Sequence, residues 1–417
     1  MRRILLLGAA PAQIPALRAA LDAGCEVHTA DNRPENPGHR LAHVCHHVDA
    51  SDASAVAALA RELRVDGVAG FSSEVCARTA ARVAAALGLP GSPLAGVENL
   101  SDKARFRACQ RRAGLVAPAW REFAENDLAA GLDFIDSLGR ERVVVKAVDN
   151  SGGRGVSIRP ADPALALPAA FRASFSRRAL VEEFVDRSGS QCGGDGWMRG
   201  GELVFLHPFD NRTLPPPADA VAIEETFPSR RSDPEIARLR QALAAAMRAA
   251  GYTDGPFNFD ACFREDGRPF LFEIAPRNAG NSIPEVIARR TGVDLAAAVV
   301  AFALGGEPVL EQGLDEGQLG LPNSGRREAR PPLGACHAIR ILAAPADGIL
   351  RSIDLAAEVE KWLWKRTDYV QPGAPVRAYR TAGEALGTLL FEFPDRATMD
   401  SVLPCLASGI TVRLEDS

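Results

Sequence analysis

Two acidic side chains face each other across a hairpin that the sequence predicts. Apolar and polar residues alternate over 257–263, which indicates a strand with one apolar and one polar face. Asp266-Gly267 is the preferred two-residue hairpin turn, and a second alternating run follows it. Counting back from that turn places Asp260 directly opposite Glu273.

The repulsion between these facing carboxylates has to be offset. A shared proton would do so by raising one pKa, and a divalent cation bound by the carboxylate oxygens would do so more strongly. A small set of oxygen ligands suits Mg²⁺, which keeps waters and shares substrate phosphates. The hairpin therefore favours a magnesium site at Asp260 and Glu273. A slipped register with solvated side chains is the alternative.

A glycine-rich loop follows a predicted strand at 143–146. Three glycines in four positions let backbone N–H groups point into one concavity, and such a nest binds phosphate. The loop joins two strands, so it is not the strand-to-helix P-loop. Lys146 ends the preceding strand, and only four of the 48 basic residues are lysines. The loop residues that would contact phosphate are Ser151, Gly152, Gly153 and Gly155. An ordinary hairpin with glycines in its turn is the alternative.

Arg277 lies just beyond the hairpin, in the segment 276–282. An arginine at this distance suits a transferring phosphoryl group, and capping of a turn is the competing interpretation. Arg340 lies on a predicted strand at 338–342, where it would grip a substrate carboxylate or pair with an internal acid. The candidates for contact with substrate are Glu74, Arg277, Asn281 and Arg340.

The elements of the first hundred residues alternate between strands and helices. Short apolar runs at 4–7, 27–30 and 65–71 predict strands, and helical spacing appears at 14–21, 56–63 and 79–87. This order implies a parallel sheet with right-handed crossovers. Ligands bind beyond the carboxyl ends of such strands, where Asp31, Asn32 and Glu74 lie. Ordinary polar loop residues explain these three side chains as well. The turn at Gly8 lacks G-x-G-x-x-G, which argues against a dinucleotide.

The remaining chain predicts mixed units. Ser101 is positioned to cap a helix that ends near residue 112, and further strands are expected at 156–158 and 179–185. Another helix begins at Asp233, an acceptor cap before a proline, and ends at Gly251. A Gly/Pro-rich stretch at 317–332 precedes short strands and turns, with one charged helix near 354–366.

Composition limits the class of function. The chain has 417 residues, too many for one ordinary core, and a formal net charge of −5 without a basic block, which argues against a nucleic-acid partner. Its eight cysteines are scattered and include no C-x-x-C pair, so we expect neither a zinc site nor a redox dithiol. Unpaired cysteines of this kind predict a reducing, cytoplasmic location. No stretch approaches the ~18 apolar residues of a membrane span.

Taken in chain order, these segments resemble those of the ATP-grasp superfamily. Each motif is weak alone, and their common order carries the resemblance. The N-terminal unit also looks like the pre-ATP-grasp domain of that family, and the C-terminal part is similar to the small β-rich domain of biotin-carboxylase-like members. The matching segments are 102–103, 145–146, 151–156, 181–185, 255–260 and 272–277.

The resemblance implies an α/β and α+β multidomain fold. A parallel-sheet pre-ATP-grasp domain would span 1–100 and a β-rich C-terminal domain 311–417. Between them, a two-subdomain ATP-grasp domain would span 101–310, with a small lid at about 115–185. Dimers are common in that family, which leaves a homodimer open.

The resemblance also implies ATP, with Mg²⁺ or Mn²⁺ held by Asp260 and Glu273. Arg277 would face the phosphoryl group in flight, and Lys146 would act with it in catalysis. The backbone of Glu182 and Val185 would hold the adenine edge. The nucleotide-binding residues would be Lys103, Lys146, Ser151, Gly152, Gly153, Gly155, Glu182, Glu183, Val185 and Gln191.

Two positions depart from the family pattern. The family often has asparagine, a further metal ligand, where this chain has Ala275, although Asn258 should face Ala275 and Asn278 is close. The acidic residue expected after the adenine strand, which often binds ribose, is replaced near Gln191. One rather than two metal ions, and altered nucleotide contacts, follow as open alternatives.

Three functions compete on this basis. The leading one is a ligase that phosphorylates a carboxylate to an acyl phosphate and couples it to an amine, releasing ADP and phosphate. A bicarbonate-activating carboxylase is the second, although the chain lacks the carrier-domain Met-Lys-Met segment. A non-catalytic ATP-binding regulatory protein is the third, supported by Ala275 and opposed by the retained Lys146, Asp260, Glu273 and Arg277.

Overall fold

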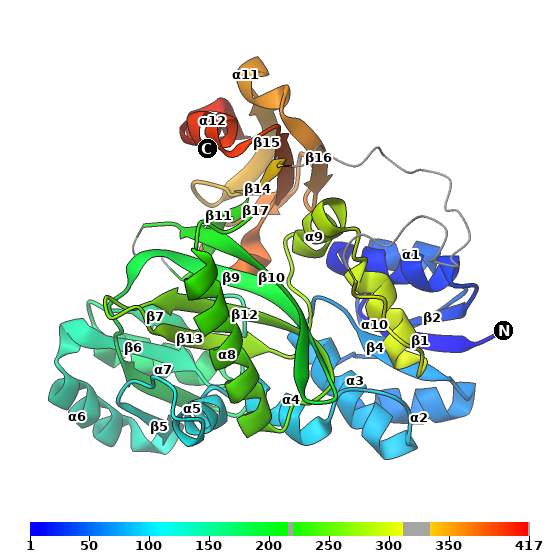
Figure 1. Cartoon of the computed structure of the whole chain (residues 1–417), viewed down its shortest axis with the longest axis horizontal. Coiled ribbons are helices and arrows are strands. Elements are labelled where there is room, and N and C mark those ends of the chain that lie inside the picture. The colour runs from blue at the N-terminus through cyan, green and yellow to red at the C-terminus, as the bar shows by residue number, and fades with distance from the viewer. Residues whose placement is uncertain (216–219, 312–333, 416–417) are drawn as a thin grey trace.

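The computed structural model describes residues 1–215, 220–311 and 334–415. The chain forms an N-terminal parallel sheet on one side, a small antiparallel sheet on the other, and a long sheet between them that continues into the C-terminal part (Figure 1). The Gly/Pro-rich stretch predicted at 317–332 lies outside the described residues.

The N-terminal sheet is parallel throughout, as the alternating pattern predicted. Its strands, in spatial order, are β3 (Val44–His46), β2 (Glu26–Ala30), β1 (Arg3–Leu7) and β4 (Gly67–Gly70). Its helices are η1 (Pro11–Gln13), α1 (Ile14–Asp22), η2 (Pro37–Leu41), α2 (Ala53–Leu63) and α3 (Glu74–Leu87). The third helix begins earlier than the apolar spacing predicted, because Ser73 caps it by accepting the N–H of Cys76.

Two short helices connect this sheet to the next, and one was not predicted. They are α4 (Leu94–Ser101) and α5 (Lys103–Arg112). Ser101 ends the first helix instead of capping the second, so that prediction was wrong. Asp102 is the cap of α5, since its carboxylate accepts the N–H of Arg105.

The small sheet is antiparallel and covered on one face by two helices. Its strands, in spatial order, are β5 (Trp120–Ala124), β8 (Arg178–Glu183), β6 (Val143–Ala147) and β7 (Val156–Ile158). Its helices are η3 (Glu125–Asp127), α6 (Leu128–Leu138), η4 (Arg140–Arg142) and α7 (Pro163–Ala173). Leu167 and Phe171 of α7 pack on Val143 and Val145, which forms a core separate from the rest of the chain.

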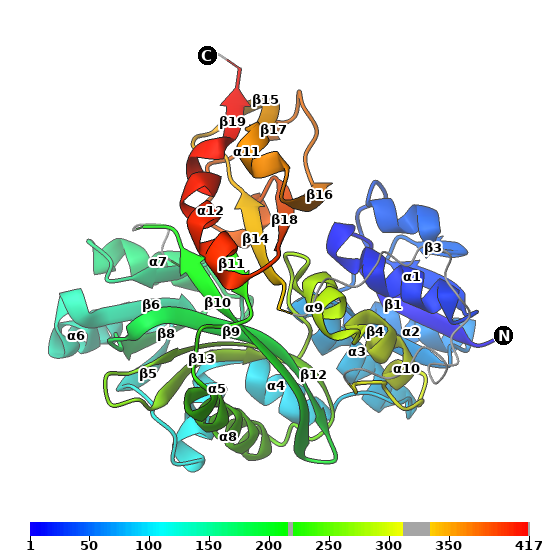
Figure 2. The same ribbon diagram turned by 45° about the horizontal axis from the view of Figure 1, so that its top comes forward.

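The long sheet has eight strands and holds the predicted hairpin at one end (Figure 2). The strands, in spatial order, are β13 (Pro269–Ala275), β12 (Gly255–Phe263), β9 (Ser188–Arg199), β10 (Glu202–Thr213), β11 (Ala222–Phe227), β14 (Cys336–Leu342), β18 (Gly387–Phe393) and β16 (Leu363–Asp368). Strands from residues 188–275 and 336–393 therefore share one hydrogen-bonded sheet.

Different helices cover the two faces of the long sheet. One face packs on α8 (Asp233–Ala250) together with α4 and α5, around Leu243, Phe257 and Phe259. The other packs on α9 (Ile283–Thr291) and α10 (Leu295–Ala303), with Phe209 and Phe227 from the sheet. As predicted, α8 ends at Gly251, whose φ of 75° suits glycine.

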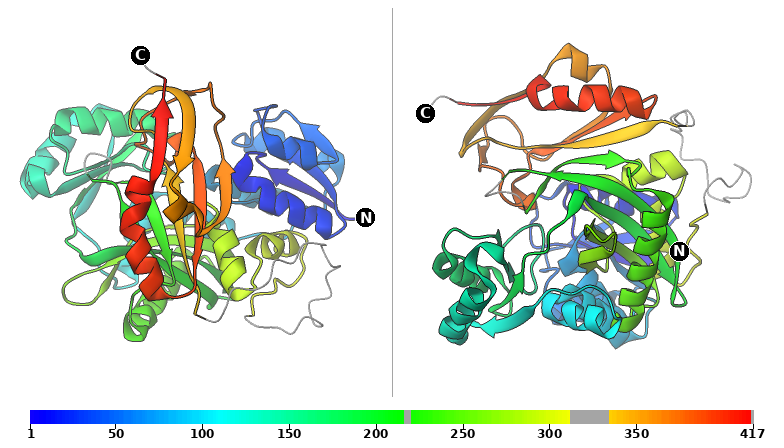
Figure 3. Two further views of the ribbon diagram at one scale, coloured as in Figure 1. Left: turned by 90° about the horizontal axis from the view of Figure 1, so that it is seen from above. Right: turned by 60° about the vertical axis from the view of Figure 1, so that its left-hand side comes forward.

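The C-terminal part adds a three-stranded sheet and a helix. Its strands are β17 (Pro375–Val376), β15 (Gly348–Leu355) and β19 (Ile410–Leu414), and its helices are α11 (Ala357–Glu360), η5 (Ala382–Glu384) and α12 (Arg396–Gly409). Figure 3 shows α12 running into β19, and α12 packs on β14 and β18 of the long sheet. The prediction of a charged helix near 354–366 was wrong, because α11 has only four residues and Leu363 begins β16. In β16, the packing of alternate side chains as a strand outweighs the helical spacing of the charged residues.

Candidate active site

The β12–β13 hairpin brings two carboxylates together. Asp260 pairs with Glu273 and Asn258 pairs with Ala275, as the sequence predicted. Successive residues of a strand point to opposite faces, so Asn258 and Asp260 share the face that packs on α9 and α10. The hairpin thus presents a polar strip to the space beside those helices.

The turn of this hairpin differs from the prediction. Arg264 donates its N–H to the carbonyl of Arg268 at 3.0 Å, so the loop has three residues and ends in Gly267 at φ 74°. A bulge between Asp260 and Ala261 then shifts the pairing by one residue. The two one-residue deviations cancel, which is why the counted pairing is observed beyond the bulge.

Asp260 has amide partners and no cation within hydrogen-bond distance among the described residues. Its Oδ1 accepts from Gln191 Nε2 at 3.2 Å and from Asn211 Nδ2 at 3.1 Å. Burial, and after it the charge of Glu273, raises the pKa of Asp260. Glu273 Oε2 lies 3.8 Å from Lys103 Nζ. Gln191, predicted near the ribose, is placed beside the facing carboxylates.

The donor set of this pair fits a magnesium ion bound together with a nucleotide. Within the described ranges, no group of three or more His, Cys, Asp or Glu side chains is arranged to hold a metal. Two facing carboxylates supply hard oxygen donors but an incomplete shell, and Mg²⁺ commonly completes its shell with waters and phosphate oxygens. Asp260 and Glu273 therefore suit a metal that arrives with its polyphosphate.

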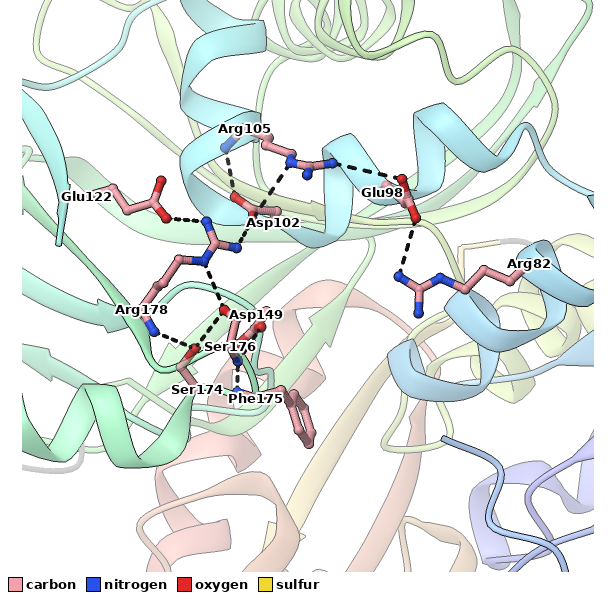
Figure 4. A network of polar contacts seen from close by, with 10 residues as sticks. All are labelled: Arg82, Glu98, Asp102, Arg105, Glu122, Asp149, Ser174, Phe175, Ser176 and Arg178. Carbon is pink, nitrogen blue, oxygen red and sulfur yellow. Dashed lines mark hydrogen bonds and ion pairs between the residues drawn. The ribbon is translucent and has the colours of Figure 1, made fainter. Parts of the chain in front are cut away.

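Lys103 lies between the glycine loop and the carboxylate pair. Its Nζ donates to the carbonyl of Asn150 at 2.5 Å, in addition to the contact with Glu273. A polar network holds the start of α5, as Figure 4 shows. Arg178 of β8 donates to Asp102 at 2.7 Å, pairs with Glu122 and contacts Ser176 at 3.0 Å. This network joins the small sheet to α5 and fixes the position of Lys103.

Lys146 belongs to a buried ionic triad. Its Nζ lies 2.6 Å from Glu182 Oε1, and Arg107 binds the same carboxylate with two donors at 2.7 and 3.2 Å. Burial alone raises the pKa of Glu182, but the charges and hydrogen bonds of Arg107 and Lys146 prevail and lower it to about 2. Burial lowers the pKa of Lys146. The side chain of Glu182 is therefore committed to the protein interior.

The glycine loop between β6 and β7 is tightly folded. Gly152, Gly153 and Gly155 have φ values of 65°, 77° and 69°, where side chains are strained. A Cβ at Gly155 would lie 2.5 Å from that of Ala173. The carbonyl of Gly152 accepts the N–H of Ala382 at 3.0 Å, so the loop lies against the C-terminal part. Glycine is required here for conformation and for space.

The segment after β8 borders a cavity of about 420 Å³. Glu183 and Val185 line it together with Arg264–Asp266 of the hairpin turn. The N–H of Glu183 donates to Ala119 at 2.8 Å. Of the two residues predicted at the adenine edge, Val185 borders this hollow and Glu182 does not; Glu183, predicted among the nucleotide-binding residues, borders it too.

Arg277 lies within the same group as the carboxylate pair. Its Nη1 donates to Asn258 Oδ1 at 3.2 Å. Glu74, at the start of α3, is close enough to Lys103, Glu273 and Arg277 to feel their charges; burial raises its pKa, and the two cations oppose that shift. The structure therefore brings together Glu74 of α3, Lys103 of α5, Glu273 of β13 and Arg277 of the segment that follows β13.

Asn281 lies nearby, whereas Arg340 lies elsewhere. Asn281 Nδ2 donates to Glu225 Oε1 at 3.0 Å, and Glu225 pairs across the sheet with Asn211, which in turn reaches Asp260. Arg340 is on the opposite face, since it pairs across strands with Glu224 and lies 3.5 Å from its carboxylate. This is the internal ion pair that the sequence left as an alternative. Asp31 is also occupied locally, because it accepts the N–H of Ala9 at 2.8 Å.

A second cavity, of about 720 Å³, opens beside this group. It lies between α1, α9 and β16, and its walls include Phe71, Ser72, Gly280, Ser282 and Tyr369. Ser72, Asn281 and Ser282 all have positive φ, a strained conformation that clusters at functional sites. The cavity therefore reaches the same segment that carries Asn281.

Several polar residues of the site escaped prediction from sequence. Arg107 follows no helical charge pattern, and Asp195 stands among glycines that hide the strand. Asp195 is fully buried, accepts the N–H of Ala279 at 2.9 Å, and has a pKa raised by burial to about 7. Glu225 carried a usable signal: it occupies the apolar phase of β11, between Ile223 and Phe227.

Comparison with known proteins gives one sequence relative and many similar folds. No protein-family model matches the chain. The uncharacterized protein y4rH of Sinorhizobium fredii is 25% identical over 354 residues, which are 83% of this chain and 67% of that protein. The L-amino acid ligase of Bacillus licheniformis has a similar structure, with a TM-score of 0.78 and 18% identity, over 100% of this chain and 99% of that one.

A carboxylase structure is also similar. The biotin carboxylase domain of the Hydrogenobacter thermophilus 2-oxoglutarate carboxylase, solved with MgADP, ADP and bicarbonate, has a TM-score of 0.70 and 16% identity, over 99% of this chain and 91% of that one. In the part of the chain that the structure describes, none of the helices combines the length and apolar character that a bilayer crossing needs.

Proposed function

We propose that this chain, whose fold is that of the ATP-grasp ligases, is an ATP-dependent ligase that activates a carboxylate as an acyl phosphate and couples it to an amine. The observation that carries the proposal is the facing pair of Asp260 and Glu273, with Lys103 and Arg277 beside it. Two carboxylates that face each other directly cost stability unless a cation bound between them neutralises their charge. A metal–polyphosphate, with its cation and its anionic tail, complements both the acids and the bases.

The reaction proceeds in two steps. The substrate carboxylate attacks the γ-phosphorus of ATP, an O–P bond forms, and the bond to the β,γ-bridging oxygen breaks, so that ADP leaves with the electron pair. The amine nitrogen then attacks the acyl carbon, a C–N bond forms, and the C–O bond to phosphate breaks. The nitrogen loses a proton, and the products are an amide, ADP and phosphate.

The protein residues act by position and charge. Lys103 and Lys146 bind phosphate oxygens, the N–H groups of the glycine loop cover them, and Arg277 stabilises the phosphoryl group as it transfers. Asp260 and Glu273 would hold Mg²⁺, which would shield the phosphate charges. Backbone groups of Glu183–Val185 contact the adenine edge.

The test is ADP and phosphate release from Mg-ATP in the presence of separate pools of amino acids, other carboxylates and bicarbonate. Glu273→Gln removes one charge of the facing pair, and Glu202→Gln, on the exposed start of β10, is the matched control. We expect carboxylate-dependent release that falls by about 10²-fold or more in E273Q and stays unchanged in E202Q.

Each other result rejects this function. Release that depends on bicarbonate alone indicates a carboxylase. ATP binding without turnover by any pool indicates a regulatory nucleotide-binding protein, and equal rates in E273Q and the parent chain remove the facing pair from the mechanism.

A further inference from the structure

Strand β11 carries two consecutive glutamates with opposite surroundings. Glu224 is paired: Arg212 binds it with two donors at 2.8 and 2.9 Å, and Arg340 lies 3.5 Å away. Glu225 is 3% exposed, and its only donor within the described residues is the amide of Asn281 at 3.0 Å. Its Oε2 atom has no hydrogen-bond partner in the part of the chain that is described. A buried carboxylate oxygen in this state costs stability unless a donor reaches it.

Glu225 is part of the active-site group. It pairs across strands with Asn211, whose Nδ2 donates to Asp260, and its charge raises the pKa of Tyr369, after the larger effects of burial and Glu285. Asn281, its single donor, lies between two residues that line the 720 Å³ cavity, and Tyr369 lines the same cavity. A substrate that fills the cavity and reaches Arg277 therefore passes close to Glu225.

The other unsatisfied polar atoms in this region include further acceptors. Asn211 Oδ1 and Asn278 Oδ1 are buried and, like Glu225 Oε2, have no donor among the described residues. Asp195, also buried here, accepts from a backbone N–H and from Asn258 and Asn278. A ligand that satisfies these acceptors brings hydrogen-bond donors, and the buried carboxylates beside them favour a donor that carries positive charge.

We infer that Glu225 binds an ammonium group of a substrate, so that at least one of the two substrates enters as a primary amine in its cationic form. An ammonium group offers three donors and no acceptor, which complements one carboxylate and nearby amide oxygens. This inference rests on the proposed ligase function and names the substrate class of the same site.

The ammonium group has one of two sources. It belongs either to the amine that attacks the acyl phosphate, or to an amino acid whose carboxylate is activated. The two differ in the step they affect. Exchange of the labelled β,γ-bridging oxygen of ATP with the non-bridging positions reports the first step, and ADP release in the complete reaction reports both.

The test compares Glu225→Gln with Glu202→Gln in the full chain. Glutamine keeps an oxygen for the Asn281 amide and removes the charge. We expect the KM of the ammonium-bearing substrate to rise about 10- to 100-fold in E225Q and to stay unchanged in E202Q. If the KM measured by isotope exchange rises in E225Q with L-alanine but not with propionate, the ammonium group belongs to the carboxylate substrate. Unchanged exchange with a raised KM for the amine assigns it to the nucleophile.

Two results overturn the inference. One is E225Q with the KM values of the parent chain for every amine and amino acid that supports turnover. The other is a change in the Mg²⁺ requirement alone, which makes Glu225 a metal ligand.

A separate measurement keeps the inference testable if the ligase proposal fails. If the parent chain shows neither exchange nor ADP release with any carboxylate, thermal unfolding is followed with ethylammonium or L-alanine in saturating Mg-ATP. A rise in Tm for the parent chain that E225Q lacks supports the ammonium site, and equal shifts in both reject it.

Discussion

The two sides of the candidate site differ in whether their buried charges have partners of opposite charge. On the side of Lys146, every charge of the buried triad has a partner: Glu182 is bound by two cations at 2.6 and 2.7 Å. On the side of β11 and the larger cavity, Glu225, Asp195 and Asp260 are acids without a cation within hydrogen-bond distance among the described residues. The first side is complete before any ligand arrives, and the second is not.

This difference indicates which parts are rigid and which are selective. A satisfied triad keeps Lys146 in place whether or not a nucleotide is bound, as a preorganised phosphate site requires. An acid-rich wall with unsatisfied acceptors is costly without ligand and favours a cationic substrate. Under the proposed function, nucleotide recognition would lie on the side whose charges are already paired, and substrate recognition on the side with unsatisfied acceptors.

The largest effect is expected from breaking the triad. Glu182→Gln leaves Arg107 and Lys146 buried without a countercharge, and loss of one partner of a buried ion pair costs about 3–5 kcal/mol of unfolding free energy. Urea unfolding at pH 7 measures this cost. Glu183→Gln is the control, because that neighbouring side chain is 43% exposed and its change should be within about 0.5 kcal/mol.

The pH dependence of the same variant gives an independent check. The pKa of Glu182 is about 2 in the folded chain and near its ordinary 4.5 when unfolded. Its stabilising contribution is therefore present above pH 4.5 and is lost as the pH falls toward 2. The difference between the parent chain and E182Q should shrink over that window. A difference that is constant with pH would mean that the loss comes from packing alone.

The facing carboxylates were predictable because alternation on a short hairpin is local. Apolar residues at every second position fixed the faces of β12, and the turn signal lay only six residues from Asp260. The prediction nevertheless succeeded through a cancellation, since the longer loop and the bulge each moved the register by one residue. Hydrophobic patterning held the register where turn chemistry alone did not.

The strained side of the site was not predictable in the same way. Glu225 meets Asn281 from 56 residues away, and Asp195 meets Ala279 from 84, so no local period links them. Arg107 and Glu182 are likewise joined only by the fold. The parallel N-terminal sheet was predicted from its regular alternation, whereas β16 was mistaken for helix because its charges masked a two-residue period.

A smaller effect, of opposite sign, is expected on β11. Burial, followed by the nearby Asp260 and Asp195 carboxylates, raises the pKa of Glu225 to about 8, while the Asn281 amide opposes the shift. Stability tied to its proton is complete below pH 4.5 and is lost as the pH rises through 8. Without ligand, the free energy of unfolding of E225Q should therefore be about 1–3 kcal/mol higher than that of the parent chain at pH 9. At pH 4.5 the two free energies should be nearly equal.

Glu224→Gln is the matched comparison for that measurement. It removes the countercharge of Arg340, whose side chain is 15% exposed, and should lower the unfolding free energy at pH 9. Among the described residues, the phenols of Tyr369 and Tyr379 also interact with the charge of Glu225; their pKa values are raised, so they stay neutral in this range. If E225Q is destabilised to the same extent as E224Q, Glu225 is not strained and the two sides of the site do not differ as described.

The smallest effect concerns the position where the sequence departs from the family pattern. The family often has an asparagine at the position of Ala275. In this chain Asn258 lies directly opposite Ala275 on the neighbouring strand, and its Oδ1 accepts a hydrogen bond from Arg277 at 3.2 Å. Asn258→Ala should lower the rate of ADP release about 5- to 10-fold through a less fixed Arg277, with little change in the KM for ATP. Steady-state kinetics over a range of Mg²⁺ concentrations measures both. The double variant N258A/A275N moves the amide to the facing strand, and recovery of the rate in it would show that either strand can supply this group. An unchanged rate in N258A would mean that Arg277 is held by its remaining bond to the carbonyl of Asn278 at 3.2 Å, and that the departure at Ala275 has no compensating residue on β12.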